Sequence, residues 1–146
     1  MLYTPLTKKA LRICFEAHKD QVDRSGLPYV FHPFHLAERL KDEETVTAAL
    51  LHDVVEDGHS TFEDLGREGI PESVLCALRL LTHDPSVPYL TYIEALKGNR
   101  IARAVKIEDL KHNLDATRLD APDAKYREKA KLYRKALRIL TQRDKV

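Results

Sequence analysis

The stretch Ala48–Gly58 reads A-A-L-L-H-D-V-V-E-D-G and places four ionisable residues inside an otherwise apolar segment. An α-helix turns about 100° per residue, so His52, Asp53, Glu56 and Asp57 fall within roughly 140° of one another and share one face. Leu51, Val54 and Val55 fall on the other side, where they anchor the helix in a core. Because unpaired ionisable groups are costly to bury, the stretch predicts a functional site that faces a cleft.

The length and charge of the chain limit what surrounds this helix. The 146 residues fit one domain, 1–146, that is large enough to bury a core. Lys and Arg number 24 against 23 Asp and Glu, and the net charge of +1 predicts neither a nucleic-acid nor a membrane partner. No apolar run approaches the roughly 20 residues of a membrane span, and the N-terminus lacks an apolar signal region, so we expect a cytoplasmic protein.

Cysteine usage agrees with an intracellular protein. Cys14 and Cys76 lie in separate helix-like segments and have no metal-type spacing. We expect both to be reduced and to serve as packing residues rather than to form a disulfide.

Apolar residues recur at helical spacing along the chain, and no convincing alternating run appears, which predicts an all-α fold of about seven or eight helices. Glycine, proline and capping residues punctuate the pattern. The expected helices cover about residues 5–21, 33–40, 42–57, a short segment after 60, a segment including 74–81, then 89–97, 99–117 and 122–142.

Local signals at the helix ends sharpen these expectations. Asp42 is expected to cap the helix of the opening stretch, and Ser60–Glu63 reads as a capping box. His32 precedes Pro33, so we expect His32 to lie just before a helix that begins at the proline. Residues 123–146 carry nine Lys or Arg against three acidic residues, which we interpret as a solvated helix face.

A metal site can be built from four of these side chains: His32, His52, Asp53 and Asp109. Imidazole and carboxylate together suit a divalent ion such as Mn²⁺, with Fe²⁺ or another divalent metal as the alternative. A divalent ion makes a nearby water easier to ionise, and a carboxylate one helical turn away can move the proton. Glu56 and Asp57 occupy that place.

Three motifs in a fixed order carry a resemblance to a known family. They are S-G-L-P-Y-V-F-H-P at 25–33, H-D-V-V-E-D at 52–57 and V-K-I-E-D-L-K-H-N at 105–113. The chain from about Leu11 to Leu119 resembles the HD superfamily of metal-dependent phosphohydrolases. Within it, the chain is similar to the hydrolase domain of RelA/SpoT-type alarmone enzymes of the stringent response and to single-domain small alarmone hydrolases. This resemblance implies an all-helical HD domain that binds Mn²⁺ and removes pyrophosphate from the 3′ position of guanosine 3′,5′-bis(diphosphate), ppGpp, or a related nucleotide.

The resemblance also implies roles for individual residues. The metal ligands it implies are the four already named, and its catalytic acidic pair falls on Glu56 and Asp57. Asn113 is implied to face the nucleotide, while Arg24 and Ser25 lie in a loop that closes over the base. Lys106, three residues before Asp109 on the same side of a helix, is a candidate phosphate contact.

Two departures from the family pattern leave the substrate open. Asp23 stands where the alarmone hydrolases have a basic residue near the guanine, and residues 114–117 differ from the usual pattern. Alternatives are therefore a phosphohydrolase for another nucleotide or phosphorylated metabolite, and a non-catalytic nucleotide-binding module. No synthetase domain is expected, and the sequence leaves the oligomeric state undetermined.

The remaining histidines are expected to have lesser roles. His35 is expected at the surface or in packing, His112 behind the site or facing solvent, and His59 in the loop after the acidic pair. His18 and His83 lack any pattern typical of a metal ligand.

Overall fold

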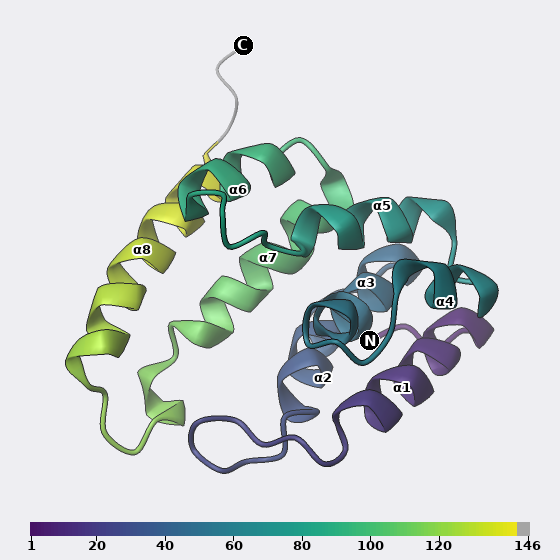
Figure 1. Ribbon diagram of the computed structural model, residues 1–146, viewed down its shortest axis with the longest axis horizontal. Helices are drawn as coiled ribbons and strands as arrows, with labels where there is room; N and C mark the ends of the chain where they lie inside the picture. Colours follow the sequence, from purple (N-terminus) through teal and green to yellow (C-terminus); the bar gives the residue numbers. More distant parts are fainter. Residues whose placement is uncertain (143–146) are drawn as a thin grey trace.

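A computed structural model describes residues 1–142, and this part of the chain is helical with no strand (Figure 1). The predicted all-α fold is therefore confirmed. The helices are α1 (Pro5–His18), α2 (Phe31–Glu38), α3 (Glu43–Glu56), α4 (Phe62–Arg67), α5 (Glu72–Leu81), α6 (Tyr89–Leu96), α7 (Arg100–Asn113), the 3₁₀ turn η1 (Ala116–Arg118) and α8 (Ala124–Thr141).

Helix α3 forms the centre of the fold and packs against α1, α2, α5 and α7. The Asp42 side chain caps it by accepting a hydrogen bond from the Thr45 amide, as predicted. Every residue from Thr45 to Val54 is buried. At its end, Gly58 adopts a φ of 80°, which glycine reaches without steric cost and which turns the chain out of the helix.

Helix α1 begins as expected and ends early. Thr4 and Thr7 form a reciprocal capping box, with Pro5 in the first turn. The helix ends at His18 rather than near Gln21, because the Gln21 carbonyl accepts a hydrogen bond from the Tyr29 amide and starts a turned-back loop. The loop contains an isolated β-bridge between Val22 and Pro28.

The prediction that α2 begins at Pro33 is wrong. The helix begins at Phe31, so His32 and Pro33 both lie in its first turn. Proline is tolerated there because its missing N–H has no helical partner at that position. His32 is consequently a buried helical residue that faces α7.

Two further boundaries differ from expectation. The segment expected as one helix over 99–117 is α7 followed by the separate turn η1, because the Asp115 side chain caps the amide of Thr117. Helix α8 begins after Asp123, which accepts from the Tyr126 amide, instead of at Pro122. In α4, Thr61 alone provides the cap in place of the expected Ser60 box.

The cysteines are both free, and only Cys14 is buried. Burial raises the pKa of its thiol to about 12. Cys76 is exposed on α5, so its expected packing role is wrong.

None of the helices in residues 1–142 is long and apolar enough to cross a membrane.

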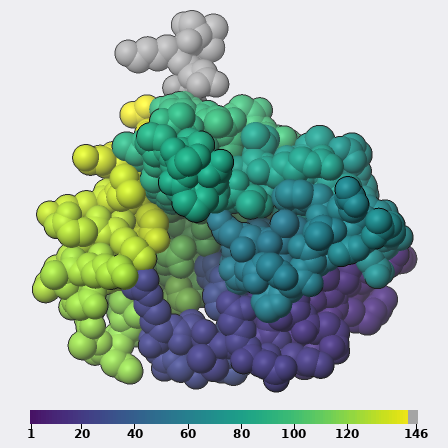
Figure 2. All heavy atoms as spheres, in the orientation of Figure 1, coloured from purple at the N-terminus to yellow at the C-terminus, as the bar shows by residue number. Residues whose placement is uncertain are grey.

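Helix α8 does not pack closely on α3, and a cavity lies between the two helices. Helix α8 packs on α7 and α6 through its buried Ala130, Ala136 and Leu140. The space-filling view shows a hollow between α8, in yellow-green, and the N-terminal segments, in purple and blue (Figure 2).

Candidate metal centre and its cavity

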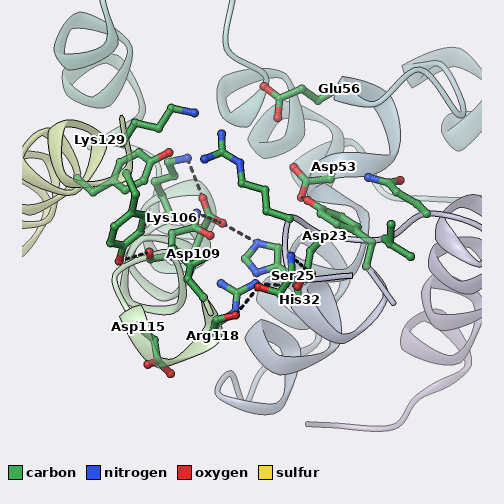
Figure 3. A pocket seen from close by; sticks show the side chains of 18 residues that line it. Asp23, Ser25, His32, Asp53, Glu56, Lys106, Asp109, Asp115, Arg118 and Lys129 are labelled. Atoms are coloured by element: carbon green, nitrogen blue, oxygen red, sulfur yellow. Dashed lines mark hydrogen bonds and ion pairs between the residues drawn. The ribbon is translucent and has the colours of Figure 1, made fainter. Parts of the chain in front are cut away.

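The folded chain brings together His32 from α2, His52 and Asp53 from α3, and Asp109 from α7. His32 Nε2 lies 2.8 Å from Asp109 Oδ1, and His52 Nε2 lies 3.8 Å from the same oxygen. Asp53 Oδ2 is 3.0 Å from His52 Nε2. Ligand atoms of His32, His52 and Asp109 all lie within 4.8 Å of one another, and the four side chains are buried. The four residues expected to bind a metal therefore form one cluster. Figure 3 shows three of them, His32, Asp53 and Asp109.

The hydrogen bonding of His52 prepares it to bind a cation. Its Nδ1 lies 2.6 Å from the carbonyl oxygen of Ala49, which only accepts, so Nδ1 carries the proton. In the neutral ring, the Nε2 lone pair then faces Asp53 and Asp109, and Nε2 is buried without a hydrogen-bond partner among the described residues. Burial opposes charge on this ring, but the two carboxylates outweigh it and raise the pKa of His52 well above its usual value. A divalent cation can replace that extra proton, so the cluster fits a metal ion.

His32 is held from its other side by a second histidine. Its Nδ1 lies 2.7 Å from His112 Nδ1, and the two rings are nearly parallel. Burial and the nearby Arg118 lower the pKa of His112 to about 3, so His112 is neutral at pH 7. A neutral His112 can accept the proton of His32 Nδ1, and this leaves His32 Nε2 free to bind a metal.

Asp109 is the most heavily bonded member of the cluster. Lys106 Nζ lies 2.8 Å from its Oδ2, and the Asn113 amide donates to its Oδ1 over 3.2 Å. Burial favours the neutral acid, but Lys106 and His32 outweigh it and hold the pKa of Asp109 well below its usual value. Lys106 and Asn113, expected to contact substrate, thus also hold Asp109.

Asp53 has a similar supporting partner on the other edge of the cluster. The Tyr29 hydroxyl donates a hydrogen bond to Asp53 Oδ2. Burial and the Asp53 charge raise the pKa of Tyr29, which keeps the hydroxyl protonated as a donor. Although burial alone would raise it, the pKa of Asp53 is lowered by His52. Asp53 is therefore an ionised carboxylate available to a cation.

The two acidic residues after Asp53 face different surroundings. Glu56 lines the cavity beside the candidate metal-binding residues, where burial and the Asp53 charge raise its pKa. The His83 backbone amide donates to Glu56 Oε1 over 3.2 Å. A carboxyl group with a raised pKa is suited to exchange protons near neutral pH.

Asp57 does not line this cavity. It is the C-cap residue of α3, where the backbone leaves the helical path, and it accepts a hydrogen bond from Gln21 Nε2 over 3.0 Å. The expectation that all four ionisable residues face the same cavity is therefore wrong for Asp57. Its amide still donates to the Asp53 carbonyl, so its side chain falls about 140° from that of His52 around the helix and lies near His18 and His59.

A cavity of about 450 Å³ lies over the cluster, within the usual range of small-molecule sites. Its lining includes Asp53, Glu56, Lys106, Asp109 and Asn113. Four basic residues also line it: Arg24, Lys106, Arg118 and Lys129. The cavity therefore brings the candidate metal-binding residues at its floor together with basic side chains on its walls (Figure 3).

The sequence did not predict that α8 forms one wall of the cavity. Tyr126, Lys129 and Tyr133 line the cavity, although the basic stretch of α8 was interpreted as a solvated face. Burial and the neighbouring Arg24 lower the pKa of Lys129, so two cations face the same space. The spacing of these three residues, i, i+3 and i+7, places them on one helix face and was the available signal.

The loop between α1 and α2 forms the facing wall with Arg24 and Ser25. Asp23 Oδ1 accepts from the amides of Ser25 and Leu27, and its Oδ2 lies 3.8 Å from Arg118. Ser25 Oγ donates to the Arg118 carbonyl over 2.5 Å. Both Asp23 and Ser25 are thus committed to holding the loop against the segment after α7.

Comparison with known proteins agrees with this arrangement. No known family model matches the chain. It is 44% identical over 62 residues to the bifunctional (p)ppGpp synthase/hydrolase SpoT of Escherichia coli, covering 40% of this chain and 9% of that protein. It is 34% identical over 108 residues to a putative chloroplastic GTP diphosphokinase, RSH1, of rice, covering 70% of this chain and 12% of that protein. The chain thus spans about a tenth of the length of these curated relatives.

A solved structure extends the similarity to nearly the whole chain. It is a metazoan ortholog of SpoT, described as hydrolysing ppGpp and as playing a role in starvation responses. The two structures align with a TM-score of 0.75 at 25% identity, covering 94% of this chain and 85% of that one. By its helical fold, its buried His–Asp cluster and these relatives, the chain is an HD-type, RelA/SpoT hydrolase-like domain.

Proposed function

We propose that this domain is a metal-dependent hydrolase that removes pyrophosphate from the 3′ position of guanosine 3′,5′-bis(diphosphate) or a closely related nucleotide. The observation that carries the proposal is the convergence of His32, His52, Asp53 and Asp109 at the floor of a cavity walled by basic residues. Relatives named as 3′-pyrophosphohydrolases of this nucleotide support the choice of substrate.

The metal ligands in this proposal are the four clustered residues. Two imidazoles and two carboxylates suit a divalent ion of intermediate hardness, and we propose Mn²⁺, with Fe²⁺ as the nearest alternative. When bound, such an ion polarises a phosphoryl oxygen and lowers the pKa of a nearby water.

The proton transfers are assigned to Glu56. Its position in the cavity and its raised pKa allow it to take a proton from the attacking water and return it to the leaving oxygen. Asp57, the second acidic residue of the resemblance, is proposed to act with it through rearrangement at the end of α3, since it faces away from the cavity in this structure.

We assign the basic side chains on the cavity walls to binding the phosphate groups of the substrate. Arg24 and Lys129 face the cavity from opposite walls, and Asn113 projects beside Asp109. A substrate with two diphosphate groups needs several charge-assisted donors, and a cavity with cations on two walls supplies them. Lys106, Ser25 and Asn113 complete the proposed substrate contacts.

The test is release of pyrophosphate from guanosine 3′,5′-bis(diphosphate) by purified protein loaded with Mn²⁺. We expect turnover that stops when the metal is chelated and returns when it is restored. A protein that holds Mn²⁺ but releases no pyrophosphate, beside an active positive control, would rule out this substrate.

A second candidate is hydrolysis of another phosphorylated compound, and Asp23 is the observation that favours it. Both of its oxygens are engaged within the protein, and it brings a negative charge to the wall where the similar enzymes carry a basic residue. A screen of phosphorylated nucleotides and metabolites under the same metal conditions separates the two. Faster turnover of a compound without guanine would favour this second candidate.

A further inference from the structure

A second group of potential metal ligands lies where α1 and α3 end. His18 is the last residue of α1, Asp57 is the C-cap of α3, and His59 follows two residues later. One ligand atom from each lies within 4.8 Å of the other two, and His18 Nδ1 is 4.0 Å from Asp57 Oδ2. Two imidazoles and one carboxylate thus converge outside the main cavity.

Gln21 occupies the space between these three side chains. Its Oε1 lies 2.9 Å from His18 Nδ1 and 3.2 Å from His59 Nε2, and its Nε2 donates to Asp57 Oδ2. The amide oxygen only accepts, so each ring presents an N–H to it. The two ring nitrogens that face the centre are therefore held in place and need only lose a proton to bind a cation.

Moving the proton on His18 leaves the number of unpaired ring nitrogens unchanged. The His18 side chain is fully buried, and its Nε2 has no hydrogen-bond partner among residues 1–142. A shift of the proton from Nδ1 to Nε2 exchanges an unpaired lone pair for an unpaired N–H and frees Nδ1. Burial lowers the pKa of His18, which also favours the neutral ring that a metal requires.

The surroundings attract a cation and give it access. Gln21, Asp57 and His59 line a shallow surface hollow together with Glu16 and Asp20. Lys19 pairs with Glu16, which leaves the hollow with an excess of carboxylates. His59 is exposed, so an ion can reach the group directly from solvent.

We propose that His18, Asp57 and His59 form a second cation site, distinct from the His32–His52–Asp53–Asp109 centre. Its donors select a first-row divalent transition metal such as Zn²⁺, with Gln21 Oε1 available as a fourth donor. A bound ion ties the end of α1 to the end of α3 and holds Asp57 away from the main cavity.

The test counts Zn²⁺ ions bound to the protein after removal of all metal by a chelator. Equilibrium dialysis followed by elemental analysis is expected to give two bound ions per chain for the unmodified protein. His59→Ala should lose one of them, whereas His35→Ala, which removes another exposed histidine, should keep both. Asp109→Ala should lose the ion of the main centre and retain the second.

Thermal unfolding gives an independent readout. Zn²⁺ should raise the melting temperature of Asp109→Ala and leave that of the double variant Asp109→Ala/His59→Ala unchanged, because only the first retains the second site. A single ion on the unmodified protein, or equal uptake by His59→Ala, would overturn the proposal. Failure of the proposed hydrolase function would show differently, as absent pyrophosphate release with the second ion still bound.

Discussion

The Nδ1 atoms of His32 and His112 lie 2.7 Å apart, so one of the two must carry a proton and the other must accept it. In the metal-free protein, His32 Nε2 also faces Asp109 Oδ1 over 2.8 Å. When Nε2 binds a metal, Nδ1 has to carry the proton, and His112 becomes its acceptor. His112 can therefore support the tautomer and the orientation that His32 needs in the proposed metal site.

Replacement of His112 tests this relationship. His112→Phe keeps a ring but removes the acceptor, so we expect Mn²⁺ affinity to fall about 10- to 100-fold. His112→Asn places an oxygen near the position of Nδ1 and should restore most of the affinity. Isothermal titration with Mn²⁺ measures both variants.

The matched control is His35→Phe. His35 stacks on His112 at 4.0 Å but makes no hydrogen bond to His32. Its replacement should leave the affinity within a few-fold of the unmodified protein. If His35→Phe and His112→Phe weaken binding equally, packing rather than the hydrogen bond is responsible.

Replacement of the two acidic residues after Asp53 should have unequal effects. Glu56→Gln removes the carboxylate that lines the cavity, and we expect turnover to fall about 10²- to 10⁴-fold with metal content unchanged. Asp57→Asn should cost less, because this side chain faces Gln21 in the structure. Pyrophosphate release and elemental analysis measure the two properties, and equal losses of turnover would show that Asp57 enters the cavity during the reaction.

The raised pKa of Glu56 predicts a dependence of stability on pH. Burial and the Asp53 charge raise this pKa in the folded state, so the folded protein is favoured below the unfolded pKa of 4.5, and that advantage is lost as pH rises through the folded pKa. At pH 7 the charged Glu56 therefore destabilises the metal-free protein.

Glu56→Gln should accordingly raise the melting temperature of metal-free protein at pH 7 and have little effect near pH 4. The exposed Glu94→Gln serves as the control and should leave the melting temperature unchanged at both pH values. A lower melting temperature for Glu56→Gln at pH 7 would mean that the carboxylate stabilises the fold there.

We expect Lys106 to contribute most to the stability of the fold when no metal is bound. Its ammonium is buried beside Asp109 and lies 5.8 Å and 5.4 Å from the ring centroids of Tyr89 and Tyr92. Lys106→Met leaves the Asp109 charge without this partner, which should cost about 3–5 kcal/mol of unfolding free energy. A bound divalent ion compensates the same charge, so the loss should shrink in saturating Mn²⁺.

Urea unfolding with and without Mn²⁺ measures this effect. Lys111→Met is the control, since Lys111 is exposed and pairs at 3.8 Å with Glu108 on the same helix. The same loss for Lys106→Met in both conditions would contradict the idea that metal and lysine share the Asp109 charge.

Asp23 is predicted to act on substrate binding through the shape of its loop. Asp23→Ala removes the acceptor of the Ser25 and Leu27 amides, and we expect KM to rise about tenfold with kcat nearly unchanged. Asp23→Asn keeps an acceptor oxygen and should raise KM much less. Steady-state kinetics measure KM for both variants. Equal increases in KM would show that the effect comes from the lost negative charge and its ion pair with Arg118, and not from the lost acceptor.

The sequence predicted the helical fold and the four side chains that lie together in the candidate metal centre. The apolar residues around His52 and Asp53 predicted a buried α3, and ligand chemistry selected His32 and Asp109 from distant segments. All four meet in the structure because α3 packs on both α2 and α7.

The structure differs from the sequence predictions at positions where contacts between helices determine how a side chain is placed. Asp57 lies at the edge of the predicted face and is held there by Gln21, just after the end of α1. His32 lies in α2 because proline is compatible with a first helical turn. The role of α8 depends on where the whole helix lies, which the charge of its residues does not indicate. Lys129 lines the cavity only because α8 packs on α7 and α6.

The attachment of the α1–α2 loop to the segment after α7 has a mechanical consequence. Ser25 Oγ holds the Arg118 carbonyl, Asp23 faces the Arg118 side chain, and that side chain donates to the carbonyl of His112 at the end of α7. One arginine thus couples the wall of the cavity to the helix that carries Asp109. Any ligand that displaces the loop therefore also disturbs the helix that carries Asp109, a member of the candidate metal centre.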